Sequence, residues 1–343
     1  MQEVIFDVET ITPLFLAGAD QETAELRAPS FRGVMRYWYR ALVGGMIGTD
    51  AKGLESVKKK ETEVFGATDR GSTVAIHVSG VSGEPKKFDE QTSRKVGGQW
   101  QATGKGYLLW TMSESGRADR GNLKPARWYF IPGTNFQLVL STKNLDDTKL
   151  KEGVATFWLL TQLGSIGSRS HRCAGSLGIR SVTNNITNLQ FVTPDNVDEL
   201  QRQLQTGIEL ARTFYDIQRI SVRNAVFDAL SRETCRIKIL YDPRQPWLTY
   251  EAAMKAIGES LQSYRSSVHP LQRRTIFGLP LKNVSNDRRT SPLLLRVTRL
   301  QNGRYVCVAT LFKTAGRDTT MADYGIIEQW MQRDFPQALE VTL

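Results

Sequence analysis

The sequence has few of the residues that build covalent or metal-bound frameworks. Its 343 residues include only three cysteines and three histidines, and both sets are widely scattered. An odd number of distant cysteines argues against a disulfide framework and for a reducing, cytoplasmic setting. The one close pair, His171 and Cys173, has no second pair to complete a zinc site. We therefore predict neither a structural metal nor a cofactor.

Long apolar runs are also missing. No run approaches the roughly 20 residues that span a bilayer, and the segment after Met1 lacks the basic and apolar regions of a secretory signal. The stretch Gly98–Gly106 superficially resembles a phosphate-binding loop, but Gly106 stands where Ser or Thr should hold magnesium. These absences predict no membrane partner and no small-molecule substrate.

What the sequence does contain is an excess of positive charge. The formal net charge is +10, while hydrophobic residues make up 40% and charged residues 23%. That composition is ordinary for a globular protein, so a packed core is expected. The basic balance favours a polyanionic partner, with nucleic acid the first candidate. At roughly 100–200 residues per domain, the length predicts two domains.

The C-terminal part has a regular pattern of strands and helices. Strands are predicted at 234–242, 292–300, 304–312 and 338–342, and helices at 322–334 and from Thr249, the expected N-cap, to about 264. Asn302-Gly303 is a strong hairpin-turn signal between the two central strands. The resulting order β-α-β-β-α-β is the ferredoxin-like arrangement that RRM domains share.

The N-terminal part gives the same order with insertions. Strands are predicted at 4–8, 73–78, 135–141 and 177–182, and helices at 150–163 and from Ser30 to about Val43. Val64–Gly66 and Ile276–Gly278 occupy equivalent positions, which suggests a duplication. We therefore predict an α+β protein with tandem ferredoxin-like (RRM-like) domains and a glycine-rich loop.

The predicted domains are residues 1–190 and 191–343. A helix at 195–216 connects them and counts with the second domain. The first domain contains an excursion at 85–124, which is too long for an ordinary loop and is interpreted as part hairpin and part mobile. Its aromatic residues could stack on unpaired bases or could equally pack into the protein. They are Trp100, Tyr107 and Trp110, and Trp128 follows soon after.

A stripe of arginines is the first candidate binding feature. Arg32, Arg36 and Arg40 are spaced by four residues, so they share one helix face, and Arg27 lies just before it. No carboxylate occurs between Arg27 and Asp50, whereas a merely solvated face usually mixes charges. The stripe is therefore predicted to face solvent and to contact RNA phosphates. The alternative is a solvated helix face.

The second candidate is the glycine- and serine-rich stretch 164–178. Its glycines would let backbone N–H groups converge on an anion, and its serines and arginines add donors. The alternative is a flexible connection between a helix and a strand. The predicted RNA contacts in and after this stretch are Gly164, Gly167, Ser168, Arg169, His171, Arg172, Gly175 and Arg180.

These features carry a family resemblance. The sequence resembles the RAMP superfamily, and most closely the family of the first subunits of CRISPR type III-B (Cmr) complexes. Cys173 departs from the pattern, because a glycine is expected at its position. The segments that carry the resemblance are Thr10–Asp20, Leu26–Arg40, Val64–Gly66 with Ser72, Ile131–Phe136 and Gly164–Gly178.

The resemblance implies a function that the residues alone do not. A member of this family would bind CRISPR RNA and target RNA toward the 3′ side of the guide, beside other Cmr subunits. It would not be an enzyme, since target cleavage in such complexes belongs to a repeated backbone subunit. Two alternatives stay open. One is a metal-independent CRISPR RNA endoribonuclease that uses His171, and the other is a generic two-domain RNA-binding regulator.

Overall fold

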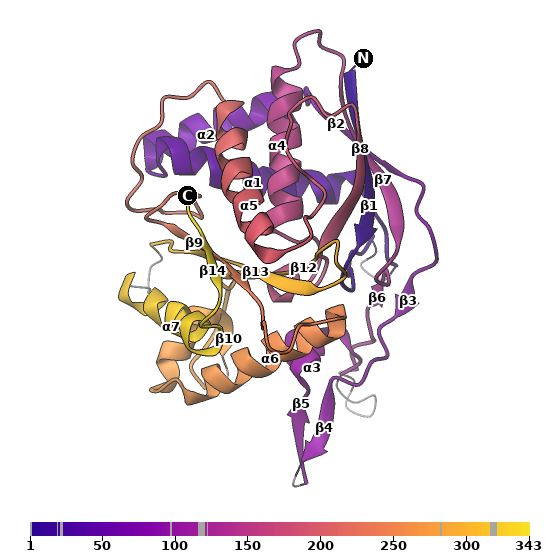
Figure 1. Ribbon diagram of the computed structural model, residues 1–343, viewed down its shortest axis with the longest axis vertical. Helices are drawn as coiled ribbons and strands as arrows, with labels where there is room; N and C mark the ends of the chain where they lie inside the picture. The colour runs from indigo at the N-terminus through magenta and orange to yellow at the C-terminus, as the bar shows by residue number, and fades with distance from the viewer. Residues whose placement is uncertain are drawn as a thin grey trace.

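Two four-stranded antiparallel sheets and their helices form the frame of the protein (Figure 1). The computed structural model describes residues 2–18, 20, 23–96, 98–115, 121, 123–281, 283–315 and 321–343. Within those ranges, none of the helices has both the length and the apolar surface that crossing a bilayer requires. The chain is a mixed α+β protein, as the sequence predicts.

The first sheet comes from the N-terminal half of the chain. Its strands lie in the order β2-β7-β1-β8, and each neighbouring pair is antiparallel. The strands are β1 Gln2–Thr10, β2 Ala75–Ser79, β7 Asn135–Thr142 and β8 Leu177–Thr183. The helices are α1 Ala28–Ile47, α2 Ala51–Phe65, α4 Thr148–Leu163 and α5 Val197–Thr213. Burial alternates along β1, so one face of this sheet packs on helices and the other stays accessible.

The second sheet repeats this arrangement. Its order is β12-β13-β9-β14, which is the same rank order of strands along the chain as in the first sheet. The strands are β9 Cys235–Leu240, β12 Leu293–Arg299, β13 Tyr305–Phe312 and β14 Leu339–Val341. The helices are α6 Tyr250–Ser267 and α7 Gly325–Asp334, with 3₁₀ turns at Leu271–Phe277 and Met321–Tyr324. A short pair, β10 Leu279–Leu281 and β11 Ser285–Arg289, lies beyond α6.

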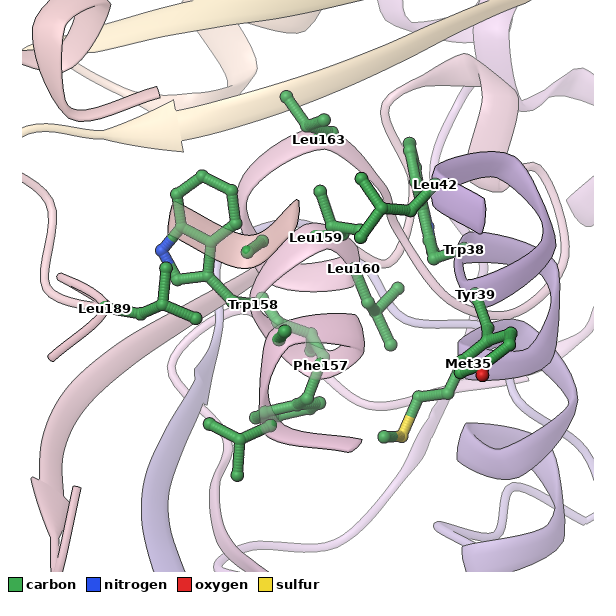
Figure 2. Close-up of a cluster of buried hydrophobic side chains, with 14 of the residues drawn as sticks. Met35, Trp38, Tyr39, Leu42, Phe157, Trp158, Leu159, Leu160, Leu163 and Leu189 are labelled. Carbon is green, nitrogen blue, oxygen red and sulfur yellow. The ribbon is translucent and has the colours of Figure 1, made fainter. Parts of the chain in front are cut away.

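Side chains from both sheets pack together in one hydrophobic core. Helices α1 and α4 contribute Met35, Trp38 and Phe157 to one core (Figure 2), and the second sheet adds Val308 and Phe312 to it. The opposite face of the second sheet packs on α6 and α7 in another core. Strands β12 and β13 are therefore buried along almost their whole length. These two strands of the second sheet thus leave no open face for a ligand.

The excursion after β2 reaches the C-terminal half of the molecule. It contains the pair β3 Lys86–Lys87 and β6 Trp128–Tyr129, the hairpin β4 Ser93–Val96 and β5 Gln99–Ala102, and helix α3 Gly104–Leu109. The predicted hairpin is confirmed; residues 97, 116–120 and 122 of the excursion lie outside the described residues. Helix α3 packs on α6 (Figure 1). A Cβ atom at Gly258 would lie 1.8 Å from the carbonyl oxygen of Gly104, so only glycine permits this approach.

Two local predictions in the N-terminal half are wrong. The first helix begins at Ala28 with Arg27 as its N-cap, so Ser30 lies inside the helix and does not cap it. Pro29 explains the earlier start, because proline is favoured in the first turn of a helix. The second difference is helix α2, which the sequence analysis does not anticipate. Asp50 caps α2 by accepting a hydrogen bond from the backbone N–H of Gly53 at 2.8 Å.

Candidate nucleic-acid interface

The arginine stripe on α1 is largely occupied by the neighbouring helix α2. Both oxygens of Glu61 accept hydrogen bonds from Arg40, and Arg36 Nε lies 3.4 Å from the same carboxylate. Arg36 also donates to the carbonyl oxygens of Phe65 and Gly66, at the C-terminus of α2. Glu61 is only 4% exposed. Arg36 and Arg40 therefore fasten α2 to α1, and the prediction of a free stripe is wrong for these two residues, although the side chain of Arg40 stays 50% exposed.

The two remaining arginines of the stripe are less engaged. Arg27 makes only a long ion pair, with its Nε 3.8 Å from an oxygen of Glu25. Arg32 forms no ion pair with any residue that the structure describes, and its Nε is buried without a hydrogen-bond partner. Of the four predicted contacts, these two keep charge available at the start of α1.

The glycine-rich loop is held by internal backbone hydrogen bonds and does not form a cradle of free N–H groups. Gly175 donates its N–H to Pro13, its carbonyl accepts from Ile166, and Ser168 donates to Phe15. A Cβ at Gly175 would lie 1.8 Å from the carbonyl oxygen of Ile166. The glycines therefore serve close packing, and the expectation that their amides converge on an anion is wrong. Gly164 and Gly167 have the same role, since a Cβ there would meet Trp38 and Phe15 respectively.

The loop also joins the two halves of the molecule. Cys173 donates its N–H to Leu295 of β12 at 2.9 Å, and it adopts a left-handed backbone with φ of 67°. That conformation explains why a glycine is expected at this position. The buried guanidinium of Arg296 donates to the carbonyl oxygen of Leu177, near the end of the loop. Burial lowers the pKa of Arg296 to about 9.

Two arginines of the loop lie close to a third arginine, from helix α6. Arg169 Nε donates to the carbonyl oxygen of Leu108 at 2.7 Å, and Arg172 donates to that of Phe277 at 2.8 Å. Arg265 of α6 donates to the hydroxyl of Tyr107 on α3 at 2.6 Å. We call Arg169, Arg172 and Arg265 the arginine cluster. It lies where the loop, the excursion and the C-terminal helices meet.

The arginine cluster contains cations without an anion. Burial, and then the charge of Arg169, lower the pKa of Arg172 to about 10. Burial also lowers the pKa of Arg169, and Arg265 adds to this effect. Among the described residues, none of the three forms a salt bridge with a carboxylate. Arg172 Nη1 and Arg265 Nε are buried without a hydrogen-bond partner. A bound anion would offset both the repulsion and the unmet hydrogen-bonding capacity.

Sequence reasoning identified Arg169 and Arg172 but missed Arg265. No local signal marks Arg265, because it lies in an ordinary amphipathic helix about 90 residues from the loop. The remaining predicted contact, Arg180, lies apart from the cluster on the accessible face of the first sheet. There it donates to Asn135 at 3.1 Å, close to Asp7. Arg180 therefore does not belong to the same site.

His171 is held inside the loop by the C-terminal half. Its Nδ1 lies 2.9 Å from the carbonyl oxygen of Ser291, and since a carbonyl only accepts, Nδ1 carries the proton. Burial lowers the pKa of His171, and the charge of Arg172 adds to this, while Asp228 acts in the opposite direction. Both oxygens of Asp228 already accept hydrogen bonds, from Tyr37 and Thr314. The histidine is thus neutral and fixed in one tautomer.

The depressed pKa of His171 predicts a pH-dependent stability. Below the ordinary value of 6.5 the unfolded chain binds a proton that the folded protein does not. We expect the free energy of unfolding to fall as the pH drops below about 6.5. His171→Asn, which keeps a donor for Ser291, should flatten this dependence in urea titrations between pH 7 and 5. His77→Asn, at an exposed position, is the control. An unchanged pH profile in the His171 variant would contradict the assignment.

The described residues offer no alternative metal chemistry. They bring no group of three or more His, Cys, Asp or Glu side chains together in a way that could hold a metal ion. The three cysteines are free and buried.

Comparison of the sequence with known proteins identifies relatives. The family model of the RAMP superfamily matches residues 7–177. The CRISPR system Cmr subunit Cmr1-1 of Pyrococcus furiosus is 27% identical over 316 residues, which cover 90% of this chain and 87% of the relative. The Cmr subunit Cmr1-2 of the same organism is 31% identical over 192 residues, which cover 52% of this chain and 96% of the relative.

Comparison with solved structures gives a consistent result. The apo crystal structure of Cmr1 from Pyrococcus furiosus aligns with a TM-score of 0.70 and 24% identity, over 100% of this chain and 99% of that chain. A chain of the cryo-EM structure of the type III-B Cmr-beta complex bound to cognate target RNA aligns with a TM-score of 0.58 and 13% identity. That alignment covers 96% of this chain and 99% of the other. At these identities the likeness establishes the fold alone.

Proposed function

We propose, from the premise that this chain belongs to the RAMP superfamily and within it to the Cmr1 family, that it is an RNA-binding subunit of a CRISPR type III-B (Cmr) complex. Its partners would be CRISPR RNA, target RNA and other Cmr subunits in the cytoplasm, with contacts toward the 3′ side of the guide. The relatives are named as Cmr subunits, and one structural neighbour belongs to a complex with target RNA.

We also infer that both units are ferredoxin-like. Each follows the order β-α-β-β-α-β along the chain. In each sheet, the third strand of the unit lies between the second and the first, and the fourth lies at the edge. The repetition supports a tandem origin, as the shared tripeptides before β2 and β12 suggest.

The observation that carries the RNA-binding proposal is the arginine cluster. Its three guanidinium groups lie close together without a carboxylate among the described residues, and two of them have a buried nitrogen without a hydrogen-bond partner. RNA phosphate is the anion for which forked guanidinium donors are best suited. The accessible face of the first sheet is less suitable, because β1 displays Glu3, Asp7 and Glu9 there.

The absence of catalysis is part of this proposal. A catalytic histidine needs a free ring nitrogen and a partner acid or base that can exchange protons. Here burial disfavours the charged imidazole of His171 and lowers its pKa, and both oxygens of the nearby Asp228 already accept hydrogen bonds from Tyr37 and Thr314. These contacts favour a structural role for His171 over the endoribonuclease alternative.

Purification of the tagged protein with its bound partners, followed by RNA sequencing, tests the proposal. We expect CRISPR RNA and other Cmr subunits to copurify. The isolated chain should bind single-stranded RNA with a log–log salt slope of roughly −0.7 per neutralised phosphate. It should leave a labelled repeat RNA intact without metal. Diverse cellular RNAs without partner proteins would favour the regulator alternative, and specific cleavage products would favour the endoribonuclease.

A further inference from the structure

Two tryptophans of the excursion and its return strand are displayed on the surface. Trp110 is 55% exposed and Trp128 is 39% exposed. Tryptophan buries a large apolar area when it is enclosed, so leaving two such rings in water forgoes a large stabilisation. By contrast, Trp38, Trp158 and Trp330 are almost completely buried. We therefore expect a binding partner to cover the two exposed rings.

The segments that carry these rings are held together by the backbone. Phe88 donates its N–H to Arg127 at 2.9 Å, and Arg127 donates its N–H to Met112 at 2.9 Å. The strand with Trp128 thus lies beside the turn that begins at Trp110. In the same region Phe15, Phe88 and Tyr129 pack on one another, with ring centroids 5.1 to 5.5 Å apart. The backbone segments that carry the two exposed rings are therefore held to each other.

Charge around the rings indicates an anionic occupant. The Nζ of Lys87 lies 5.5 Å from the centre of the Trp128 ring, and Lys86 and Lys87 are both exposed. An apolar protein partner would have to bury this ammonium group, whereas a phosphate would pair with it. Asp89 and Glu114 are exposed in the same segments, so the surface is mixed in charge away from Lys86 and Lys87.

The segment that leads to Trp110 also contacts the arginine cluster. Arg169 donates to the carbonyl oxygen of Leu108, which is two residues before Trp110 in the same helical segment. Tyr107 of that segment accepts from Arg265. One short stretch of chain therefore links the guanidinium groups to the first exposed ring. Basic side chains beside exposed aromatic rings are the combination that binds single-stranded nucleic acids.

We propose that Trp110 and Trp128 form a stacking platform for unpaired RNA bases, while the phosphates of the same strand lie on the arginine cluster. This inference rests on the proposed RNA-binding function and specifies that the bound RNA is single-stranded. A π face is available on unpaired bases but is covered in a continuous duplex, so the platform selects single-stranded segments. Because stacking does not depend on base identity, little sequence preference follows.

The test compares Trp110→Ala and Trp128→Ala with the wild type on a labelled oligouridine and on a blunt RNA duplex. Each alanine variant is expected to bind the single strand about tenfold more weakly. Duplex affinity should stay unchanged, and the corresponding phenylalanine variants should recover part of the loss. Leu145→Ala, which removes a side chain that is 96% exposed outside the excursion, is the matched control.

Other outcomes overturn the proposal. Alanine variants that bind the oligouridine like the wild type would show that the rings do not stack on bases. An equal loss on the single strand and the duplex would point to a general effect. A loss of copurifying subunits with RNA affinity intact would assign the surface to a protein partner. If the wild type bound no RNA at all, the proposed function itself would fail first.

Discussion

Replacing Arg169 and Arg265 together by glutamine is expected to lower the affinity for single-stranded RNA about a hundredfold. A hydrogen bond to a charged group contributes about 1.5–3 kcal/mol, and about 1.4 kcal/mol corresponds to a factor of ten. Each guanidinium therefore accounts for roughly a tenfold change if it contacts a phosphate. The log–log salt slope should become shallower by about 0.7 per lost contact. Fluorescence anisotropy with a labelled oligonucleotide at several salt concentrations measures both quantities.

The matched control removes the same charge elsewhere. Arg202→Gln with Arg304→Gln lowers the net charge by two at exposed positions on α5 and in the hairpin turn. That variant should lose only the small, long-range part of the attraction. Equal losses in both double variants would mean that total charge and not the cluster governs binding. Full affinity in a folded Arg169/Arg265 variant would make the cluster a brace between the two halves.

Glu61→Gln is expected to destabilise the protein by about 2–3 kcal/mol. Breaking a buried ion pair by removing one partner costs about 3–5 kcal/mol, and this value is reduced here because the pair is not fully enclosed. The side chain of Glu61 is 5% exposed, but those of Arg36 and Arg40 are 30% and 50% exposed. Arg40→Gln should cost less, about 1 kcal/mol, because Arg36 still pairs with Glu61 and the lost pair involves a half-exposed arginine. Urea unfolding followed by circular dichroism measures both differences.

Glu61→Gln also distinguishes a structural role of Arg36 and Arg40 from a role in RNA binding. RNA affinity at a temperature where the variant is folded should stay close to that of the wild type. If Arg36 and Arg40 served RNA instead, removing the charge of Glu61 would release them, raising RNA affinity while leaving stability unchanged. Glu55→Gln makes the same chemical change at an exposed position of α2 and should alter neither quantity.

Most regular elements could be predicted because their signals are local. The alternation of Val4, Phe6 and Val8 reports burial on one face of a strand, and β1 has that burial pattern. Thr249 was expected to cap the helix that follows, and it accepts a hydrogen bond from the N–H of Ala252. Asn302-Gly303 marks the hairpin between β12 and β13, where Gly303 adopts a positive φ. Helix α2 was not predicted because its sequence is mainly polar.

The binding features were predicted less well because their meaning depends on distant partners. The stripe looked free of carboxylates within its own helix, yet Glu61 of the following helix pairs with it. The glycines of the loop looked like an anion cradle, yet Gly175 is buried against Pro13 and Ile166. In both cases the local sequence pattern was recognised, but the residues that contact it could not be predicted.

The sequence by itself determined the α+β character, the order of strands and helices, and the basic charge, since all three depend on composition and short-range period. Only the tertiary structure decided which of the described arginines pair with a carboxylate of the described residues and which do not. Arg36 lies on a regular helix face, but the packing of α2 against α1 places Glu61 beside it. No local sequence pattern marks Arg265. The packing of α3 on α6 places it beside the glycine-rich loop, near Arg169. The reason is physical: periodicity fixes which face a side chain occupies, and packing fixes what that face meets.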